Sequence, residues 1–340
     1  MRTAIILALT LICGPVSAAE MTLKCEDLRP RYSALKTMRM QPVRRGKAWL
    51  SGVPESELLV TCDRYGMKTG EFQYSRKSLV LRHKMVYQDR KTARLFCENA
   101  ESNDELTSGF SQDARASLED FCRKQKKKDF DAVLVYDETA GAAGNRSEPF
   151  KHIFRVYNGA GFVSEEYFFD PASGFETKKV YSYDAKNNLT EAAEIDFSGT
   201  QIKRETFSFD KITASKTHSV YRQTNELLEK TVSQYREDST LRSITIYSYD
   251  AGAQLVSKSE IRCSAAGLQE KEVIYRGDFE KPAYEYHYSH KLDPKGNWAE
   301  RRKTKFIFFN GKYFPDTQSH PEITRREITY YDLPAAAGTP

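Results

Sequence analysis

The sequence predicts a mainly β fold, with an α+β N-terminal region and an antiparallel β-meander of hairpin repeats in the C-terminal half. The chain of 340 residues carries 20 Tyr and 19 Phe against 2 Trp, and large rings favour strands. Beyond residue 150, an aromatic residue followed by Asp, Asn or Arg recurs at steps of 12 or 14 residues. Hydrophobic residues make up 39% of the chain and charged residues 29%, which is typical of an ordered globular protein.

Residues 1–18 have the pattern of a secretory signal peptide. Arg2 gives a positive start, an apolar run from Ala4 to Cys13 follows, and the small residues at 16–18 suit cleavage. No later stretch is long and apolar enough for a transmembrane helix. We therefore expect an exported protein, periplasmic or extracellular. The formal net charge of +5 is too mild to indicate a nucleic-acid binder.

Export would place the remaining cysteines in an oxidising compartment, where disulfides form. Cleavage leaves Cys25, Cys62, Cys97, Cys122 and Cys263. The first four allow three pairings, of which we favour Cys25–Cys62 and Cys97–Cys122. Cys263 is the odd cysteine, and two alternatives stay open for it: a buried thiol, or a bridge to another chain.

Residues 19–140 are expected to form a disulfide-bearing α+β domain. Its clearest helix is predicted at 111–127, because Ser111 can cap it and an apolar stripe follows. The small, polar residues 141–149 are typical of a linker. The other expected elements are a weak helix at 28–38, from apolar residues at helical spacing, and strands at 58–62, 78–87 and 131–137.

Residues 150–333 are expected to form the β-hairpin repeat domain, followed by a flexible tail at 334–340. A period near thirteen residues fits a strand of about eight residues and a turn of about five. An outer-membrane barrel is the alternative, but it needs an outward apolar band, and charged residues occupy both strand parities here. The pattern alone leaves open whether the sheet is open, spiral or closed.

Two segments of this half, Tyr181–Leu189 and Tyr247–Leu255, resemble YD-repeat units of the RHS family. Residues Asp293–Trp298 and Arg325–Asp332 resemble the ending of small exported bacterial RHS-repeat-like proteins. The resemblance covers about residues 155–332 and implies an all-β meander or spiral sheet from a bacterial envelope. It supplies no catalytic residue, and the region is too short to enclose a toxin as large RHS shells do.

The sequence contains no recognisable motif of an enzyme or a metal centre. Nucleophile-elbow, P-loop and zinc-protease patterns are absent, so we expect no catalytic residue, no metal ligand and no cofactor. His287 and His290 lie three residues apart, which on a strand places them on opposite faces. Aspartates recur at the turns, where Asp bonds to the backbone; they are Asp170, Asp184, Asp210 and Asp250.

Two surfaces are candidates for binding. One is a set of strand tyrosines, because exposed rings hold glycans or partner strands; burial in a core is the alternative. The other is a basic helix end that suits anionic lipid, although cations there also oppose the helix dipole. The tyrosines are Tyr247, Tyr249, Tyr284, Tyr286 and Tyr288, and the basic residues are Arg123, Lys124, Lys126, Lys127 and Lys128.

Together these features predict a non-enzymatic binding or scaffold protein of the cell envelope. Two alternatives stay open. One is an envelope hydrolase acting on polysaccharide or peptidoglycan, with a carboxylate pair between the domains. The other is an accessory protein of a toxin or secretion system. The expected partners are an envelope glycan, anionic lipid or another envelope protein, and no nucleic acid.

Overall fold

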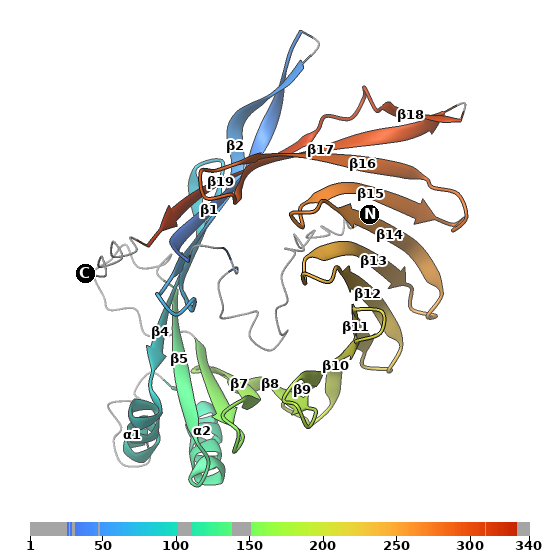
Figure 1. The fold of residues 1–340 in the computed structure, drawn as a ribbon. Helices are drawn as coiled ribbons and strands as arrows, with labels where there is room; N and C mark the ends of the chain where they lie inside the picture. The colour runs from blue at the N-terminus through green and yellow to red at the C-terminus, as the bar shows by residue number, and fades with distance from the viewer. Residues whose placement is uncertain are drawn as a thin grey trace, which may run out of the picture.

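The computed structural model describes residues 26, 28, 31–46, 48–100, 110–137, 151–309 and 311–331. The predicted signal peptide, linker and tail lie outside the described residues, as does Cys25. Within the described part, nineteen strands form one antiparallel sheet, and two helices stand between the fourth and fifth strands. Figure 1 shows this sheet curling into a ring.

The elements follow one another along the chain in the order of their labels. The first are β1 (Tyr32–Arg45), β2 (Ala48–Cys62), β3 (Lys68–Ser75), β4 (Ser78–Gln88), α1 (Arg90–Ala100) and α2 (Gln112–Gln125). Next come β5 (Phe130–Asp137), β6 (Lys151–Tyr157), β7 (Val163–Asp170), β8 (Gly174–Tyr183), β9 (Leu189–Asp196), β10 (Gln201–Asp210), β11 (Ser215–Arg222) and β12 (Leu227–Tyr235). The last are β13 (Leu241–Tyr249), β14 (Leu255–Cys263), β15 (Gln269–Arg276), β16 (Tyr284–Leu292), β17 (Trp298–Phe309), β18 (Lys312–Pro315) and β19 (Glu322–Tyr330).

Backbone pairing closes the sheet into a barrel. From β1 to β17 each strand pairs with the next one in the chain, and β18 pairs with β17. β19 pairs with β17 on one side and with β1 on the other, where Ile328 stands opposite Leu35. With β18 set aside, eighteen of the nineteen described strands form the ring. At a strand spacing of about 4.8 Å and a tilt of about 40°, its perimeter is on the order of 110 Å.

Closure divides the side chains between an outward wall and a lumenal wall. Both helices lie outside the ring (Figure 1) and pack on Phe130, Phe154 and Phe169, so side chains of that parity point outward. The cross-strand pairs carry this assignment around the ring, because opposed residues share a face. They place Leu35 and Ile153 on the lumenal wall.

The helices cover an aromatic core on the outside of β5–β8. Phe121 of α2 lies against Phe154, with ring centroids 4.8 Å apart, and both side chains are buried. Ser111 caps α2, since its hydroxyl accepts a hydrogen bond of 3.1 Å from the backbone N–H of Ala114. The disulfide Cys97–Cys122 joins α1 to α2, which confirms that predicted pairing. Cys62 is also disulfide-bonded.

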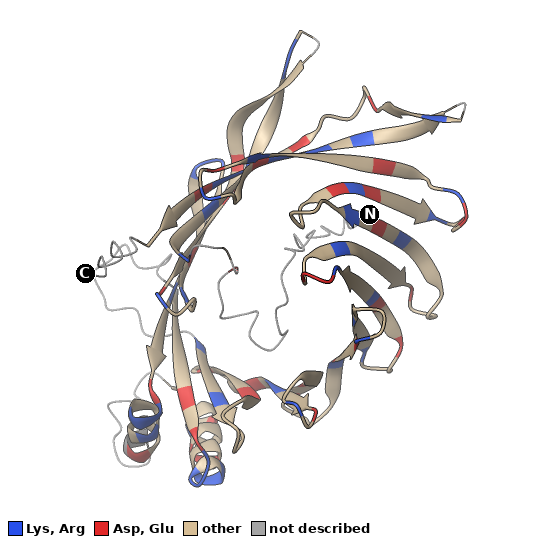
Figure 2. Ribbon diagram, viewed as in Figure 1, with Lys and Arg blue, Asp and Glu red and all other residues tan. Residues whose placement is uncertain are grey.

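The rest of the outward wall carries many charged side chains. Lys36 pairs with Glu57 at 2.8 Å and Arg325 with Glu300 at 2.8 Å, both between neighbouring strands. Figure 2 shows basic and acidic residues spread along the strands around the ring. A transmembrane barrel needs an apolar outward band, whereas these strands carry ion pairs on their outward face. In the described part of the chain, no helix combines the length and apolar character needed to cross a membrane.

The closed barrel corrects three expectations. The N-terminal region is not a separate α+β domain, because β1–β5 belong to the same sheet as β6–β19. The C-terminal half is not an open meander or a spiral of RHS/YD repeats, because β19 returns to β1; that resemblance is therefore wrong. The segment expected as a helix at 28–38 mostly forms β1. It lacks a period of two because side chains are buried on both faces there, Leu35 on one and Met38 on the other.

Other local predictions are confirmed. Strands occur where 58–62, 78–87 and 131–137 predicted them, and α2 matches the expected helix. The thirteen-residue period corresponds to successive hairpins from β6 to β14, because its aromatic–polar pairs fall at the ends of these strands. The recurrent aspartates act in their turns: Asp184 Oδ1 accepts hydrogen bonds from the backbone N–H groups of Lys186 and Asn188 at 2.8 and 2.9 Å.

Candidate functional site: an aromatic–cation row on the lumenal wall

Three of the predicted tyrosines line the lumen on β16. Tyr284, Tyr286 and Tyr288 alternate along the strand and share the lumenal face. The adjacent strand β17 opposes Tyr286 with Lys305 and Tyr288 with Lys303. Since alternate residues of a strand lie about 6.7 Å apart, rings and cations form two parallel series at one spacing.

Each ring in this series lies against a cation. The Lys303 ammonium lies 3.9 Å from the Tyr286 ring centroid and 5.6 Å from that of Tyr288. The Lys305 ammonium lies 5.1 Å from the Tyr284 ring centroid. Contacts of this kind contribute about 0.5–1 kcal/mol each when exposed and more when desolvated.

Beyond Tyr288, the series of rings and cations continues with Trp298 and Arg301 of β17 and Arg326 of β19. Arg301 lies 5.2 Å from the Trp298 ring centroid, and Arg326 of β19 lies 3.5 Å from it. We call the whole set the aromatic–cation row. Tyr284 and the partner of Trp298 on β16, Leu292, are eight residues apart, which is about 27 Å along a strand. The row consists of Tyr284, Tyr286, Tyr288, Trp298, Arg301, Lys303, Lys305 and Arg326.

Carboxylates hold the cations of the row in place. Lys303 pairs with Glu272 at 3.0 Å, and Tyr288 donates a hydrogen bond of 2.5 Å to the same carboxylate. Burial alone would raise the pKa of Glu272, but the charge of Lys303 and these hydrogen bonds bring it below its ordinary value. Lys305 pairs with Asp316 at 3.3 Å. The row therefore presents fixed donors and acceptors beside aromatic rings.

Burial shapes the titration of the row. It raises the pKa of Tyr286 to about 12, with the neighbouring Tyr284 adding to the effect. Burial also lowers the pKa of His290, on the same wall, to about 4, and the charges of Arg301 and Arg326 act in the same direction. Tyr286 is therefore a neutral hydrogen-bonding group, and His290 is uncharged, at neutral pH.

The predicted tyrosine surface is divided by the barrel wall. Tyr247 stands opposite Lys230 and Lys258 on the outward face of β13, and Tyr249 has the same parity. The lumenal tyrosines of β16 lie on the other side of the sheet. The five residues therefore do not form one surface.

The predicted anion-binding patch lies at the end of α2, outside the barrel. Arg123 and Lys124 both pair with Asp120, at 2.8 and 2.5 Å, and Lys128 pairs with Glu165 at 3.4 Å. Lys126 and Lys127 are exposed. As an anion-binding site the patch remains a prediction.

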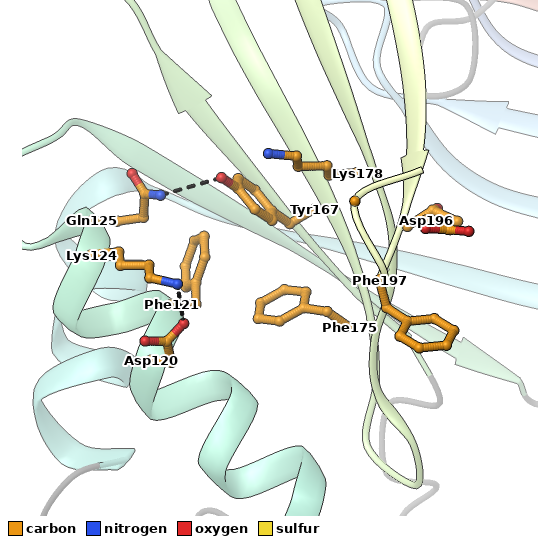
Figure 3. Close-up of a pocket in the computed structure, with 11 residues that line it drawn as sticks. Asp120, Phe121, Lys124, Gln125, Tyr167, Phe175, Lys178, Asp196 and Phe197 are labelled. Atoms are coloured by element: carbon orange, nitrogen blue, oxygen red, sulfur yellow. Dashed lines mark hydrogen bonds and ion pairs between the residues drawn. The ribbon is translucent and has the colours of Figure 1, made fainter. Parts of the chain in front are cut away.

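A groove separates α2 from the outward face of β7–β9 (Figure 3), with a volume of about 320 Å³. Phe121, Tyr167 and Phe175 form its apolar part, and Lys124 reaches its edge. The Gln125 amide donates a hydrogen bond of 3.4 Å to the Tyr167 hydroxyl. Of the predicted basic patch, only Lys124 lines this groove.

The barrel wall separates the two histidines of β16. His287 points outward and His290 into the lumen, on opposite faces as expected. No group of three or more His, Cys, Asp or Glu side chains in the described part is placed to hold a metal ion. The hydrolase alternative needs a carboxylate pair between two domains, whereas the strands of both regions form one sheet. Cys263 is a buried thiol on β14.

Sequence reasoning missed the partners of the tyrosines. Arg301, Lys303 and Lys305 alternate on β17, and this period of two was the signal that could have found them. Arg326 had no such signal, because its place beside Trp298 depends on the pairing of β19 with β17.

The fold and the row define a closed β-barrel with a polar, aromatic lumen. No protein-family model matches the chain, and no curated protein matches it. Among solved structures, a porin-like protein from Bacteroides uniformis is 10% identical, with a TM-score of 0.42, and the match covers 87% of this chain and 97% of that one. A porin-like protein from Bacteroides vulgatus is 9% identical, with a TM-score of 0.31 over 89% and 99% of the two chains.

Proposed function

We propose that this chain is an exported, non-enzymatic envelope protein that binds a glycan along the aromatic–cation row. The observation that carries the proposal is the alternation of rings and charged groups over about 27 Å of the lumenal wall. Rings such as those of Tyr286 and Trp298 offer apolar faces to the faces of sugars. The paired charges of Lys303 and Glu272 offer a donor and an acceptor to sugar hydroxyls.

Two further observations support an exported glycan binder. The disulfide Cys97–Cys122 is of a kind that persists in oxidising compartments. Lysines of the row pair with carboxylates, as Lys305 does with Asp316. The lumenal wall here therefore carries mixed positive and negative charges and is not a basic channel. A wall of mixed charge suits a polyhydroxylated chain better than a nucleic acid, whose binding depends on net positive charge.

The proposal is tested with paired substitutions on the two walls. The lumenal pair is Lys303→Gln with Lys305→Gln, and the matched outward pair is Lys230→Gln with Lys258→Gln. Binding of oligosaccharides prepared from bacterial envelopes is measured by the change in tryptophan fluorescence and by calorimetry. A single-stranded oligonucleotide serves as the nucleic-acid arm.

We expect the lumenal pair to weaken glycan binding at least tenfold and the outward pair to leave it unchanged. Equal effects of both pairs would contradict a lumenal site. Tighter binding of the oligonucleotide than of any glycan would replace the proposal with a nucleic-acid binder. The absence of any glycan binding by the wild-type protein would refute it.

A further inference from the structure

The most buried part of the row already holds a carboxylate. Glu26 accepts two hydrogen bonds from Arg326, each of 2.8 Å, one from Nη1 and one from Nη2. The side chains of Arg326 and Glu26 are only 3% and 7% exposed. The two residues lie 300 positions apart in the chain, so this contact joins the N-terminal segment to the last strand of the ring.

The site around Glu26 is built for a carboxylate beside a flat ring. The Arg326 guanidinium lies 3.5 Å from the Trp298 ring centroid, so one of its faces is covered. Its edge then presents two parallel N–H groups, the arrangement that matches a carboxylate. Arg301 lies on the same ring, 5.2 Å from its centroid, and adds a second positive charge.

Glu26 leaves part of this site unused. The Nε of Arg326 is buried and has no hydrogen-bond partner among the described residues, although a guanidinium carries five N–H donors. A buried donor without a partner costs about 1–3 kcal/mol. A carboxylate that approaches the guanidinium from its side engages this donor together with Nη2, whereas Glu26 binds Nη1 and Nη2.

We propose that Arg326 and Trp298 form a subsite for the carboxylate of an acidic sugar, which Glu26 occupies as an internal substitute. The proposal rests on the proposed glycan binding and adds the sugar class. Displacing Glu26 opens the subsite, and Leu28, which is buried against Tyr32 and Leu35, still anchors the segment. The row then takes a chain that carries a uronic acid at its Trp298 end.

The test uses the whole protein with Glu26→Ala, and Glu26→Gln as a second variant that keeps the side-chain volume. D-glucuronate, D-glucose and acetate are added at equal concentration, and the thermal midpoint is measured. We expect glucuronate to raise the midpoint of Glu26→Ala, glucose to leave it unchanged, and acetate to have a smaller effect. In the double variant Glu26→Ala with Arg326→Gln the glucuronate effect should vanish.

Oligosaccharides then separate this inference from the function on which it rests. Oligogalacturonate should bind Glu26→Ala about tenfold more tightly than it binds wild type, as expected for a charge-assisted pair, while neutral oligosaccharides bind both equally. No response of either Glu26 variant to glucuronate, with neutral oligosaccharides still bound, would overturn the subsite and leave the glycan function standing. An acetate effect as large as that of glucuronate would overturn selection for a sugar.

Discussion

The substitution His152→Phe tests how strongly the stability of the aromatic core beneath α1 and α2 depends on pH. We call these two helices the helical cover of the barrel. His152 is 2% exposed and lies among aromatic rings of α1, β6 and β7, with centroids 5.7 Å away for Phe96 and 5.8 Å away for Phe169. Within the part of the chain that the structure describes, neither ring nitrogen has a hydrogen-bond partner. Burial lowers the pKa of His152 from 6.5 to about 4, because the charged imidazole would have no solvation there.

Stability falls as the pH falls, because the unfolded chain binds the proton at a higher pH than the folded chain does. The folded pKa is lower than the unfolded one, so between these values the unfolded chain binds the proton and the folded chain does not. The stability that neutral His152 permits is complete above about pH 6.5 and is lost as pH falls towards 4. A difference of about 2.5 pKa units at 1.36 kcal/mol per unit corresponds to about 3 kcal/mol.

Urea denaturation followed by circular dichroism measures this effect at pH 7, 5.5 and 4. We expect wild type to lose about 3 kcal/mol relative to His152→Phe between pH 7 and pH 4. Other groups titrate in both proteins, so the difference isolates His152. The control is His320→Gln, which changes an exposed imidazole and should follow wild type. A wild-type difference from His152→Phe that stays constant over this range would refute the reasoning.

Three further predictions concern helices α1 and α2, cleavage of the signal peptide and the outward wall of the barrel. Replacing Cys97 and Cys122 with Ser should lower the stability of the helical cover by about 3.5 kcal/mol, from the loop entropy of a 25-residue separation. Faster hydrogen exchange in α1 and α2, with β9–β15 unchanged, is the readout, and unchanged helices would contradict it. Mass spectrometry of the exported protein should find Ala19 or Glu20 at its N-terminus, and a retained Met1 would argue against cleavage. Because the outward wall carries ion pairs such as Lys36–Glu57, the protein should fractionate without detergent, and recovery only with detergent would contradict an aqueous outer wall.

Local structure was predictable where the signal lies within a short segment. The Ser111 cap and the apolar stripe after it defined α2, and the aromatic period defined the hairpins. The disulfide Cys97–Cys122 follows the same principle, because its cysteines lie on two helices adjacent in the chain. In each case the partners are within about one supersecondary unit.

Closure was not predictable in this way. It depends on β1 meeting β19, with Leu35 opposite Ile328 across almost the whole chain. Neither strand carries a sequence pattern from which its pairing partner can be predicted. A hairpin repeat also has the same local pattern in an open sheet as in a ring. Strand parity has the same limit. It predicts that Tyr284 and Tyr286 share a face. Whether that face points into the lumen or outward depends on the pairing of successive strands, including register shifts such as the one at Tyr249 and Leu255.

The distribution of side chains between the two walls bears on where a ligand can bind. On the outward wall the ion pairs link neighbouring strands and the apolar cluster is covered by α1 and α2. On the lumenal wall the aromatic–cation row lies along β16, β17 and β19, and its residues are half-buried except Arg326, which is buried. A ligand along this row must enter the barrel from an end and lie parallel to a strand, which favours an extended chain over a compact molecule. The contact of Glu26 with Arg326 shows that this wall already engages a carboxylate of the protein's own chain.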